Sequence, residues 1–443
     1  MTMTVADRLR PLVRELLGAD LPIRIGCWDG SSFGPPDAPA TLVFTSRRAL
    51  RWLLWAPNEL GMARAYVSGD VDVEGDMMAG LAALELLADP EYGPTVHIDG
   101  ATRRHVAAAA FALGIVGGPP KVPAEEIQLA GRLHSRRRDS EAVSSHYDVG
   151  NDFYRLVLGE SMTYSCAYFE QSPSESFSLA DAQLAKCDLV SRKLALAPGM
   201  RVLDVGCGWG TFAIRAAQQY GATAVGVTLS RAQATLARKR VADAGLSDKV
   251  EIRVQDYRDI DDGPYDAVSS IGMAEHVGAD LLGTYAAEMF SLLRPEGRLL
   301  NHAIARRPGP RPEPSATSFI DRYVFPDGEL ESLGTMVEAI ETAGFEVRDV
   351  EALRENYDLT LRAWVRNLEE NWDAAIASSS PGRARIWRLY MAGSALAFRA
   401  GRLGVNQVLA VKPGRSGVVG ITATRQVAPD TWRRTHGDEP HDA

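Results

Sequence analysis

Apolar and polar positions along the chain change their rhythm near Met200. Beyond that point, short apolar runs rich in β-branched residues alternate with longer segments whose apolar positions recur about every three to four residues. The predicted strands are RVLDV, TAVGVTL, VEIRVQD, YDAVSSIG and RLLNHAI, and the predicted helices are TFAIRAAQQY, RAQATLARKRVADAG and LGTYAAEMFSLLRPEG. This alternation of strand and helix predicts an α/β fold built on a doubly wound parallel sheet.

The part of the chain before Met200 has a more mixed pattern. ATLVFTS (Ala40–Ser46) predicts a strand and MMAGLAALELL (Met77–Leu87) predicts a helix. Residues 1–115 are therefore expected to form a smaller α+β N-terminal domain. Gly117–Glu126 is rich in proline and glycine, and we interpret residues 116–140 as a linker.

The C-terminal part returns to long helices. The predicted elements are a loop at Gly309–Pro314, a helix at Gly328–Ala343, a strand at FEVRDVEA, long helices from Leu359 to about Arg402, and a final strand at GVVGITATRQ. Residues 141–428 are expected to form one larger domain with a helical insertion or cap. The polar residues 429–443 are expected to be a flexible tail.

Length, charge and cysteine spacing narrow the class of protein. A chain of 443 residues suggests about two domains, and a net charge of −9 argues against nucleic acid as a partner. Cys27, Cys166, Cys187 and Cys207 show no C-x-x-C spacing, so the sequence supports neither a metal site nor a disulfide framework. Reduced cysteines are typical of a cytoplasmic protein.

Two stretches bear on the relation to membranes. The start, MTMTVADRLRPLVRELL, lacks the apolar core of a signal peptide, and the weakly polar run Val106–Pro120 is too short to span a bilayer. We therefore expect a cytoplasmic protein, which would meet a lipid substrate peripherally at the inner membrane face.

A glycine-rich turn follows the first strand of the expected sheet. In Val202–Gly210, VLDVGCGWG, the strand delivers Asp204 and then Gly206, Gly208 and Gly210 before a helix. Glycines let a ligand approach the backbone closely, so the motif alone modestly favours a nucleotide-like ligand over a tight turn without any ligand, and its β-α-β setting strengthens that prediction. The spacing differs from the dinucleotide fingerprint G-x-G-x-x-G. It resembles the turn of class I S-adenosylmethionine-dependent methyltransferases.

That resemblance implies a set of cofactor contacts. They lie in the glycine turn, at the ends of the second and third strands, where open α/β sheets bind ligands, and in MTYSCAYFE (Met162–Glu170). The second strand lacks the acidic residue expected to hold ribose hydroxyls, and Thr228, Leu229 and Gln233 stand there instead. The candidates are Tyr164, Ser165, Asp204, Gly206, Gly208, Thr228, Leu229, Gln233, Gln255, Asp256 and Tyr257.

An ordered series of motifs makes the resemblance more specific. SSHYDVGNDFYRLVLGESMTYSCAYFE, VLDVGCGWG, GVTLSRAQ, SIGMAEHVG, LLNHAI, ENYDLTLRAWVRN and GRLGVNQVLAVKP resemble the cyclopropane-fatty-acyl-phospholipid synthase family, from His146 to about Lys412. That family includes mycolic acid cyclopropane synthases and the 10-methylene and 10-methyl acyl-chain methyltransferases. ELGMARAYVSGDVDVEGD (Glu59–Asp76) resembles the additional N-terminal, lipid-associated domain of phospholipid-acting members.

The resemblance implies a reaction and the residues that perform it. A cis double bond attacks the sulfonium methyl group of S-adenosylmethionine, and a bound bicarbonate ion removes a proton from the resulting cation. The implied bicarbonate ligands are Cys166, Glu275, His302, the backbone at Ile304, and Tyr357. Cys166 would then help to hold an anion and would not be a covalent nucleophile.

Elementary chemistry agrees with most of this site. An anion in an apolar pocket needs several directed donors, which His302, Tyr357 and weakly a thiol can provide. Glu275 is the exception, because two adjacent anions repel, so it must be protonated, orient His302, or share a proton. Aromatic rings would stabilise the developing cation, and the candidates are Tyr147, Phe153, Tyr154 and Tyr164. Taken singly, Cys166 is more simply a buried small residue and Tyr357 an ordinary half-buried tyrosine. His302 is more simply a satisfied polar group at a strand end, and Glu275 the start of a helix.

Product and partners remain open at this stage. Loss of a proton from the transferred methyl group would close a cyclopropane, and a hydride shift before proton loss would leave a 10-methylene branch. The second product would need a separate reductase to become a methyl branch. A methyltransferase of soluble small molecules and a non-catalytic lipid-binding relative are the alternatives, and a homo-oligomer is open. The candidate membrane contacts are Arg136–Arg138, the loop with Arg306, Arg307 and Arg311, and Arg103–Arg104.

Overall fold

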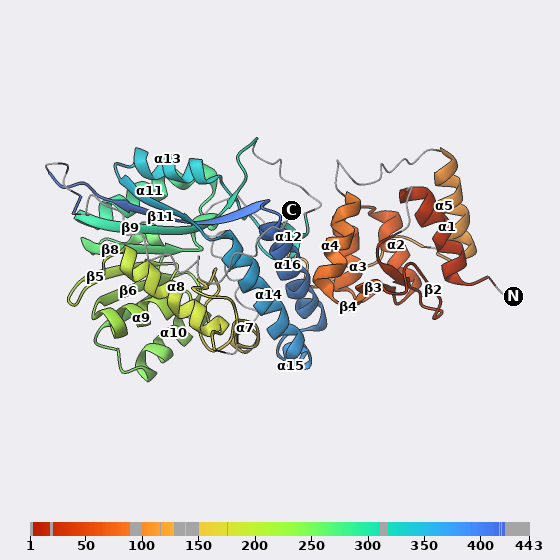
Figure 1. The fold of residues 1–443 in the computed structure, drawn as a ribbon, viewed down its shortest axis with the longest axis horizontal. Helices are drawn as coiled ribbons and strands as arrows, with labels where there is room; N and C mark the ends of the chain where they lie inside the picture. The colour runs from red at the N-terminus through yellow and green to blue at the C-terminus, as the bar shows by residue number, and fades with distance from the viewer. Residues whose placement is uncertain are drawn as a thin grey trace, which may run out of the picture.

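The structure is a computed structural model. It describes residues 3–17, 21–88, 100–115, 117–127, 138, 150–174, 176–310, 318–415, 417, 419 and 420. Most of the predicted linker, the predicted tail and Tyr147 therefore lie outside the described residues. Two sheets organise the chain, and each is covered by its own helices (Figure 1). The domain boundaries at 115 and 140 stay a prediction.

The N-terminal unit is built on a small four-stranded sheet of order β2-β1-β3-β4, in which only β1 and β3 run parallel. Its elements are α1 (Val5–Leu17), β1 (Arg24–Gly26), β2 (Ser32–Phe33), β3 (Ala40–Phe44), α2 (Arg47–Trp55), α3 (Glu59–Val67), β4 (Val71–Gly75), α4 (Met77–Ala88) and α5 (Gly100–Ala112). Ser46 and Asn58 begin α2 and α3 by accepting backbone N–H bonds with their side chains. The strand and the helix predicted in this unit are confirmed.

The C-terminal unit is built on a large seven-stranded sheet of order β10-β11-β9-β8-β5-β6-β7. Its strands are β5 (Arg201–Val205), β6 (Thr223–Thr228), β7 (Val250–Val254), β8 (Tyr265–Ile271), β9 (Leu293–Arg306), β10 (Glu346–Ala352) and β11 (Leu403–Val411). The strands from β9 to β7 are parallel, as the alternating pattern predicts. The order reverses between β5 and β8, and such a switch point opens a ligand crevice at the carboxyl ends of the strands.

The last strand of the sheet corrects the sequence-based prediction. β11 lies between β9 and β10 and is antiparallel to both, so the large sheet is mixed. β11 is buried over most of its length, and a strand buried on both faces lacks the alternation by which strands are recognised. The strand predicted at GVVGITATRQ is wrong for its described residues, since Gly417, Val419 and Gly420 adopt no strand. The remainder lies outside the described residues.

Helices cover both faces of the large sheet (Figure 1). One face carries α8 (Leu179–Lys193), α9 (Thr211–Tyr220) and α10 (Arg231–Asp243), and the other carries α11 (Leu282–Leu292) and α13 (Leu333–Thr342). The helix predicted from Gly328 begins only at Leu333, because Ser332 caps it. The remaining helices are α7 (Asn151–Leu158), α12 (Phe319–Tyr323), α14 (Arg354–Glu370), α15 (Trp372–Ser378) and α16 (Pro381–Arg399), with short 3₁₀ turns η1 (Tyr257–Asp259), η2 (Ala274–His276) and η3 (Ala279–Leu281).

The two units share one hydrophobic core. Leu60, Tyr66 and Met77 from the N-terminal unit pack in the same buried cluster as Trp387 and many other residues of the C-terminal helices. Arg385 of α16 donates to Asp72 of β4 at 2.9 Å across this contact. The N-terminal unit is therefore packed directly against the helices of the C-terminal unit. No helix in the described ranges is long and apolar enough to cross a membrane.

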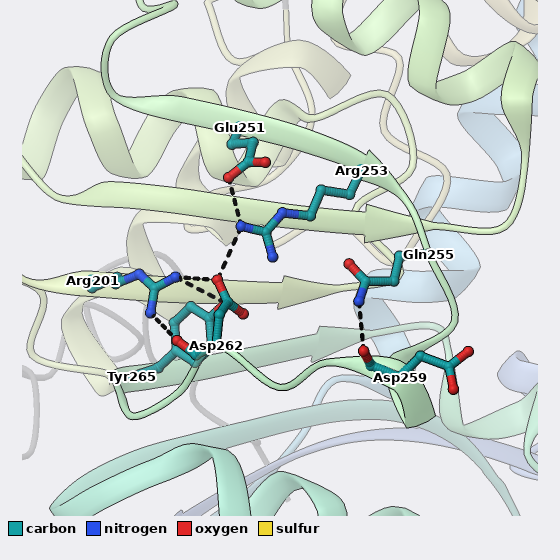
Figure 2. A network of polar contacts seen from close by, with 7 residues as sticks. All are labelled: Arg201, Glu251, Arg253, Gln255, Asp259, Asp262 and Tyr265. Carbon is teal, nitrogen blue, oxygen red and sulfur yellow. Dashed lines mark hydrogen bonds and ion pairs between the residues drawn. The ribbon is translucent and has the colours of Figure 1, made fainter.

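A network of charges anchors the loop between β7 and β8 (Figure 2). The Asp262 carboxylate accepts hydrogen bonds from Arg253 at 3.0 Å and from the Tyr265 hydroxyl at 2.8 Å, and Arg201 pairs with it from β5. At the other end of the loop, Gln255 Nε2 donates to the carbonyl of Asp259 at 2.8 Å. The loop carries Gln255 toward the crevice described next.

Candidate functional site

A cleft with a volume of about 170 Å³ lies at the carboxyl ends of the parallel strands. The eleven residues predicted to contact the cofactor all line it, so the structure brings together segments that are remote in the sequence. They are Tyr164, Ser165, Asp204, Gly206, Gly208, Thr228, Leu229, Gln233, Gln255, Asp256 and Tyr257. The cleft is also lined by residues that the sequence did not single out, among them Lys186, Trp209, Met273 and His276.

The glycine turn after β5 forms the floor of this cleft. The N–H groups of Gly206 and Cys207 both donate to the carbonyl of Val227 at 3.0 Å, which ties the turn to β6. Gly206 has a φ of +80°, and a Cβ at this position would meet the side chain of Met273 at 3.1 Å. A side chain there would be strained by the backbone and would press on the cleft wall, so glycine is required.

Polar side chains occupy the ends of β6 and β7. The Thr228 hydroxyl donates to Gln233 Oε1 at 2.9 Å, and both residues are buried. This neutral pair stands where an acidic residue was expected for the ribose. After β7, Asp256 accepts two hydrogen bonds from the Arg258 guanidinium, at 2.9 and 2.6 Å, and one from the Arg258 backbone N–H at 3.0 Å. The carboxylate of Asp256 is therefore already partly neutralised by its own loop.

Helix α8 positions the segment that carries Tyr164, Ser165 and Cys166. Gln183 Nε2 donates to the carbonyl of Ser165 at 2.9 Å, and Lys186 Nζ donates to the Ser165 hydroxyl at the same distance. On the opposite side, the N–H of Ala167 donates to Thr360 of α14 at 3.0 Å. The segment is thus held between two helices, with its side chains directed at the cleft on one side and the core on the other.

Lys186 is the functional residue that sequence reasoning missed most clearly. Its side chain is 2% exposed, and it lines the cleft together with Asp204. Burial raises the pKa of Asp204 to about 7, and the charge of Lys186 opposes that rise. The same charge lowers the pKa values of Cys166 and His302, so it reaches both halves of the site. The only signal in the sequence is a lysine within the otherwise small and apolar face of α8.

The proposed anion site lies on β9 and η2. Ile304 N–H donates to Glu275 Oε1 at 2.8 Å, and Gln407 Nε2 of β11 donates to His302 Nδ1 at 3.2 Å. Glu275 Oε2 and His302 Nε2 are both buried, and neither has a hydrogen-bond partner among the described residues. His302 and Ile304 are two positions apart on one strand, so their side chains share a face. Two buried polar atoms without partners are the feature expected of a small polar ligand's site.

Burial determines the protonation states of Glu275 and His302. Burial raises the pKa of Glu275 to about 7, while the N–H of Ile304 acts in the opposite direction. Burial also lowers the pKa of His302 to about 3, so the imidazole is neutral. Because Gln407 donates to Nδ1, the imidazole hydrogen lies on Nε2. A protonated Glu275 and a neutral His302 can both donate to an anion, which favours the protonated form among the three alternatives for Glu275.

The Cys166 thiol and the backbone N–H of Tyr357 both donate to the carbonyl of Leu353. Cys166 Sγ donates to it at 3.6 Å and to Ala167 O at 3.2 Å, and the N–H of Tyr357 donates to it at 3.2 Å. Burial raises the pKa of the Cys166 thiol far above its usual range, so it is a poor nucleophile. In this arrangement the thiol hydrogen and the Ile304 amide are engaged by the protein. In this part of the site, Glu275 Oε2 and His302 Nε2 remain available to an anion.

Aromatic rings connect the cleft with this site. Tyr164 lies 5.3 Å from Trp364 and 5.5 Å from Trp387 between ring centroids, and Tyr154 lies 4.9 Å from Trp209. The Tyr164 hydroxyl donates to that of Tyr390 at 3.2 Å. Burial raises the pKa of Tyr164 well above its usual value, with Tyr357 and Tyr390 adding to the rise. Of the predicted aromatic candidates, Phe153, Tyr154 and Tyr164 belong to this cluster.

The strand order, the glycine turn and the cleft at the carboxyl ends define the class I methyltransferase fold. The structure is similar to the cyclopropane synthase MmaA2 from Mycobacterium tuberculosis, with a TM-score of 0.58 and 33% identity over 64% of this chain and 100% of that chain. It is also similar to the mycolic acid cyclopropane synthase CmaA1 solved with SAH and CTAB, with a TM-score of 0.57 and 35% identity over 62% of this chain and 98% of that chain.

Sequence comparison places the chain within a family. The model of the mycolic acid cyclopropane synthetase family matches residues 134–408. A probable fatty acid methyltransferase of Mycobacterium tuberculosis is 42% identical over 88% of this chain and 91% of its own length. A probable fatty acid methyltransferase of Pseudomonas putida is 38% identical over 94% of this chain and 99% of its own length. The cyclopropane-fatty-acyl-phospholipid synthase of Escherichia coli is 36% identical over 64% of this chain and 72% of its own length. The chain belongs to the cyclopropane synthetase family, which confirms the resemblance found in the sequence.

Proposed function

We propose that this protein uses S-adenosylmethionine to add one carbon to the cis double bond of an unsaturated acyl chain in a membrane phospholipid. One observation carries the proposal. Met273 and His276 line the cofactor cleft and flank Glu275, which accepts a hydrogen bond from the Ile304 N–H on the strand that also bears His302. Tyr164 of the cleft wall packs against the core cluster that contains Tyr357. A cofactor cleft and an anion site that share their walls are what a methyl transfer followed by proton removal requires.

The residues present fit both absent groups. S-adenosylmethionine supplies an electrophilic methyl group when bound, and a bicarbonate ion supplies a base. The glycine turn allows close approach of the cofactor, and Thr228 with Gln233 would face its polar portion. Glu275 Oε2 and His302 Nε2 offer two buried donors to bicarbonate. In their uncharged forms, a protonated Glu275 and a neutral His302 can hold the anion without neutralising it as a base.

The aromatic cluster has a separate role in this reaction. Attack of the double bond on the methyl group breaks the bond from sulfur to that carbon and leaves positive charge on the acyl chain. The faces of Tyr164 and of the rings around it stabilise such a cation without forming a bond to it. The same rings exclude water, which would otherwise trap the cation. Loss of a proton to the base then completes the product.

The share of this chain that each relative matches indicates which product should be tested first. Two relatives that match over 88% and 94% of this chain are named probable fatty acid methyltransferases, whereas the cyclopropane-fatty-acyl-phospholipid synthase of Escherichia coli matches over 64% of it. We therefore favour a methylene branch, which a separate reductase would convert to a methyl branch, with a cyclopropane as the second product. The test is expression in a host that makes oleoyl phospholipids, followed by mass spectrometry of the fatty acids. Because the two products have equal mass, fragmentation is needed to distinguish them.

Substitution of Glu275→Gln tests the chemical role. The amide keeps the shape of the side chain but cannot release or share a carboxyl proton. Turnover of oleoyl phospholipid should fall about a hundredfold or more, as for loss of a general acid–base group. Affinity for S-adenosylhomocysteine, measured by calorimetry, should stay nearly unchanged, because Glu275 does not line the cofactor cleft. Activity equal to that of the unsubstituted enzyme would reject the assigned role.

A further inference from the structure

Among the described basic groups expected to meet lipid, those of the C-terminal half are engaged within the protein, and Arg136, Arg137 and Arg311 lie outside the described residues. Arg138 forms a two-bond ion pair with Asp327, with an Nη2–Oδ1 distance of 2.7 Å. Arg306 donates to the carbonyl of Leu330 at 3.0 Å and pairs with Glu331, and Arg307 donates to the carbonyl of Ala400 at 3.1 Å. Arg104 on α5, in contrast, is exposed. This contrast directs attention to the N-terminal unit.

Helix α5 presents an apolar outer face. Ala107, Ala108, Phe111 and Ala112 are all exposed, and their spacing places them on one side of the helix. Phe111 is 82% exposed, the largest value among the described large apolar residues. A helix on the surface of a water-soluble unit normally carries polar residues on its outer side. α5 lies at the end of the molecule farthest from the large sheet (Figure 1).

The C-terminal turn of α2 adds two more apolar side chains. Leu54 is 43% exposed and Trp55 is 57% exposed, although most residues of these types are buried. The indole Nε1 of Trp55 donates to the carbonyl of Gly117 at 3.2 Å, which fixes the orientation of the ring at the surface. A tryptophan with its polar edge satisfied and its face exposed is typical of a position at a membrane interface.

Contacts show that α2 and the end of α5 lie on one surface. The N–H of Gly114 donates to the carbonyl of Phe111, and the guanidinium of Arg47 lies beside Gly114. One turn later along α2, Arg51 donates to the carbonyl of Gly118. The exposed residues Arg47, Leu54, Trp55, Arg104, Phe111, Lys121 and Val122 are named here the α2–α5 surface.

The charge of this surface is opposite to that of the whole chain. The stretches 46–58 and 100–122 contain no aspartate or glutamate, in a chain of net charge −9, and their basic residues with described side chains are Arg47, Arg48, Arg51, Arg104 and Lys121. Nearby carboxylates are already engaged, since buried Asp70 pairs with Arg48 at 3.4 Å and Glu15 pairs with His105 at 3.1 Å. Apolar side chains with a basic rim complement an anionic lipid surface, where each basic group contributes about 1 kcal/mol before salt screening.

We infer that the α2–α5 surface docks the enzyme on anionic phospholipid bilayers. The inference rests on the proposed function, because only a bilayer substrate requires such a surface. Trp55 and Phe111 enter the interfacial region of the bilayer, and the arginine and lysine side chains contact headgroup phosphates. The N-terminal unit also packs against α16 of the catalytic half, so docking tethers that half to the membrane that holds its substrate.

Vesicle flotation of the full-length protein tests this surface. Unsubstituted enzyme should float with phosphatidylcholine vesicles that contain phosphatidylglycerol, less with phosphatidylcholine alone, and less at high salt. The double substitution Trp55→Ser and Phe111→Ser should lower the partition coefficient about tenfold or more. The double substitution Arg104→Glu and Lys121→Glu should abolish the preference for phosphatidylglycerol. The matched control is Val350→Ser, an equally simple loss of an exposed apolar residue from β10, which should float normally.

Turnover of detergent-dispersed phospholipid separates docking from catalysis. All of these variants should retain that activity, because none of the substituted residues lines the cleft. Flotation equal to that of the unsubstituted enzyme in the Trp55 and Phe111 variant would overturn the inference. So would a change from dimer to monomer in that variant with flotation unaltered, which would assign the surface to a second copy of the chain. Absence of turnover in detergent by the unsubstituted enzyme would instead reject the proposed function.

Discussion

At the scale of single residues, Lys186 interacts with both the cofactor cleft and the proposed anion site. Its ammonium group donates to Ser165 at 2.9 Å, and its charge acts on Asp204 in the cofactor cleft and on His302 in the proposed anion site. A buried ammonium group is stable only with partners that offset its loss of hydration. Ser165 and Asp204 are such partners, so Lys186 is a positioning residue for the segment that bears Tyr164 and Cys166.

Replacement of Lys186→Met should weaken cofactor binding. The apolar side chain has a similar length but leaves Asp204 buried without a nearby positive charge, so the carboxylate will be more readily protonated. Affinity for S-adenosylhomocysteine, measured by calorimetry, should fall about tenfold to a hundredfold. Thermal unfolding of the same sample reports whether the variant is folded.

The control for this prediction lies on the same helix. Arg192 is 53% exposed and pairs only at 3.5 Å with Glu170, so Arg192→Met should leave affinity unchanged. Ser165→Ala, which removes the acceptor of the amine, should show a smaller loss than Lys186→Met. Wild-type affinity in a folded Lys186→Met protein would show that the charge is not needed by the cleft.

At the scale of elements, the loop between β7 and β8 is held by ion pairs at one end and lines the cofactor cleft at the other. Gln255, Asp256 and Tyr257 line the cofactor cleft, whereas Asp262 is held by Arg201 and Arg253 at the start of the sheet (Figure 2). The hydrogen bond from Arg253, helped by those from Tyr265 and Arg201, keeps the pKa of Asp262 well below its usual range. The network therefore stabilises the loop that shapes the cleft.

Substitution of Asp262→Asn should lower the free energy of unfolding by about 1–3 kcal/mol at neutral pH. Because the pKa of Asp262 is lowered in the folded state, its stabilisation is present above the unfolded value of about 4 and is lost as pH falls below it. The difference between the two proteins should therefore shrink as the pH is lowered from about 5 to about 3. Urea unfolding at several pH values measures it.

Asp261→Asn is the matched control, since Asp261 is the exposed neighbour of Asp262. It should change the free energy of unfolding by less than about 0.5 kcal/mol. A loss that is the same for both substitutions, or one that does not depend on pH, would show that the ion pairs around Asp262 contribute nothing specific.

At the scale of the whole molecule, the N-terminal unit and the catalytic half are one packed body where they meet. Leu60 of α3 lies in the same core cluster as Phe153, Trp209 and Tyr390, the rings that border the site. The N–H of Phe319 donates to Glu59 at 3.1 Å across the same contact. A change in the N-terminal unit can therefore alter the packing behind the aromatic wall.

Substitution of Leu60→Ala should destabilise both units. Loss of a buried leucine costs about 2–5 kcal/mol, and the cavity would lie at the shared core. Amide hydrogen exchange should become faster in α16 as well as in α3. Leu54→Ala, an exposed position on α2, should leave exchange in both helices unchanged. Faster exchange confined to residues 1–115 would show that the two units do not share their stability.

The sequence alone determined the parallel part of the large sheet and the glycine turn. These two features follow from local spacing, because strand and helix periods and turn chemistry are written in consecutive residues. The eleven predicted residues that border the cleft came instead from the resemblance of the sequence to class I methyltransferases. Only the tertiary structure decided that β11 inserts beside β9, that Lys186 reaches the cleft, and that Ile304 N–H is taken by Glu275. Those features depend on pairings between distant segments and on burial, and neither is encoded in the order of neighbouring side chains.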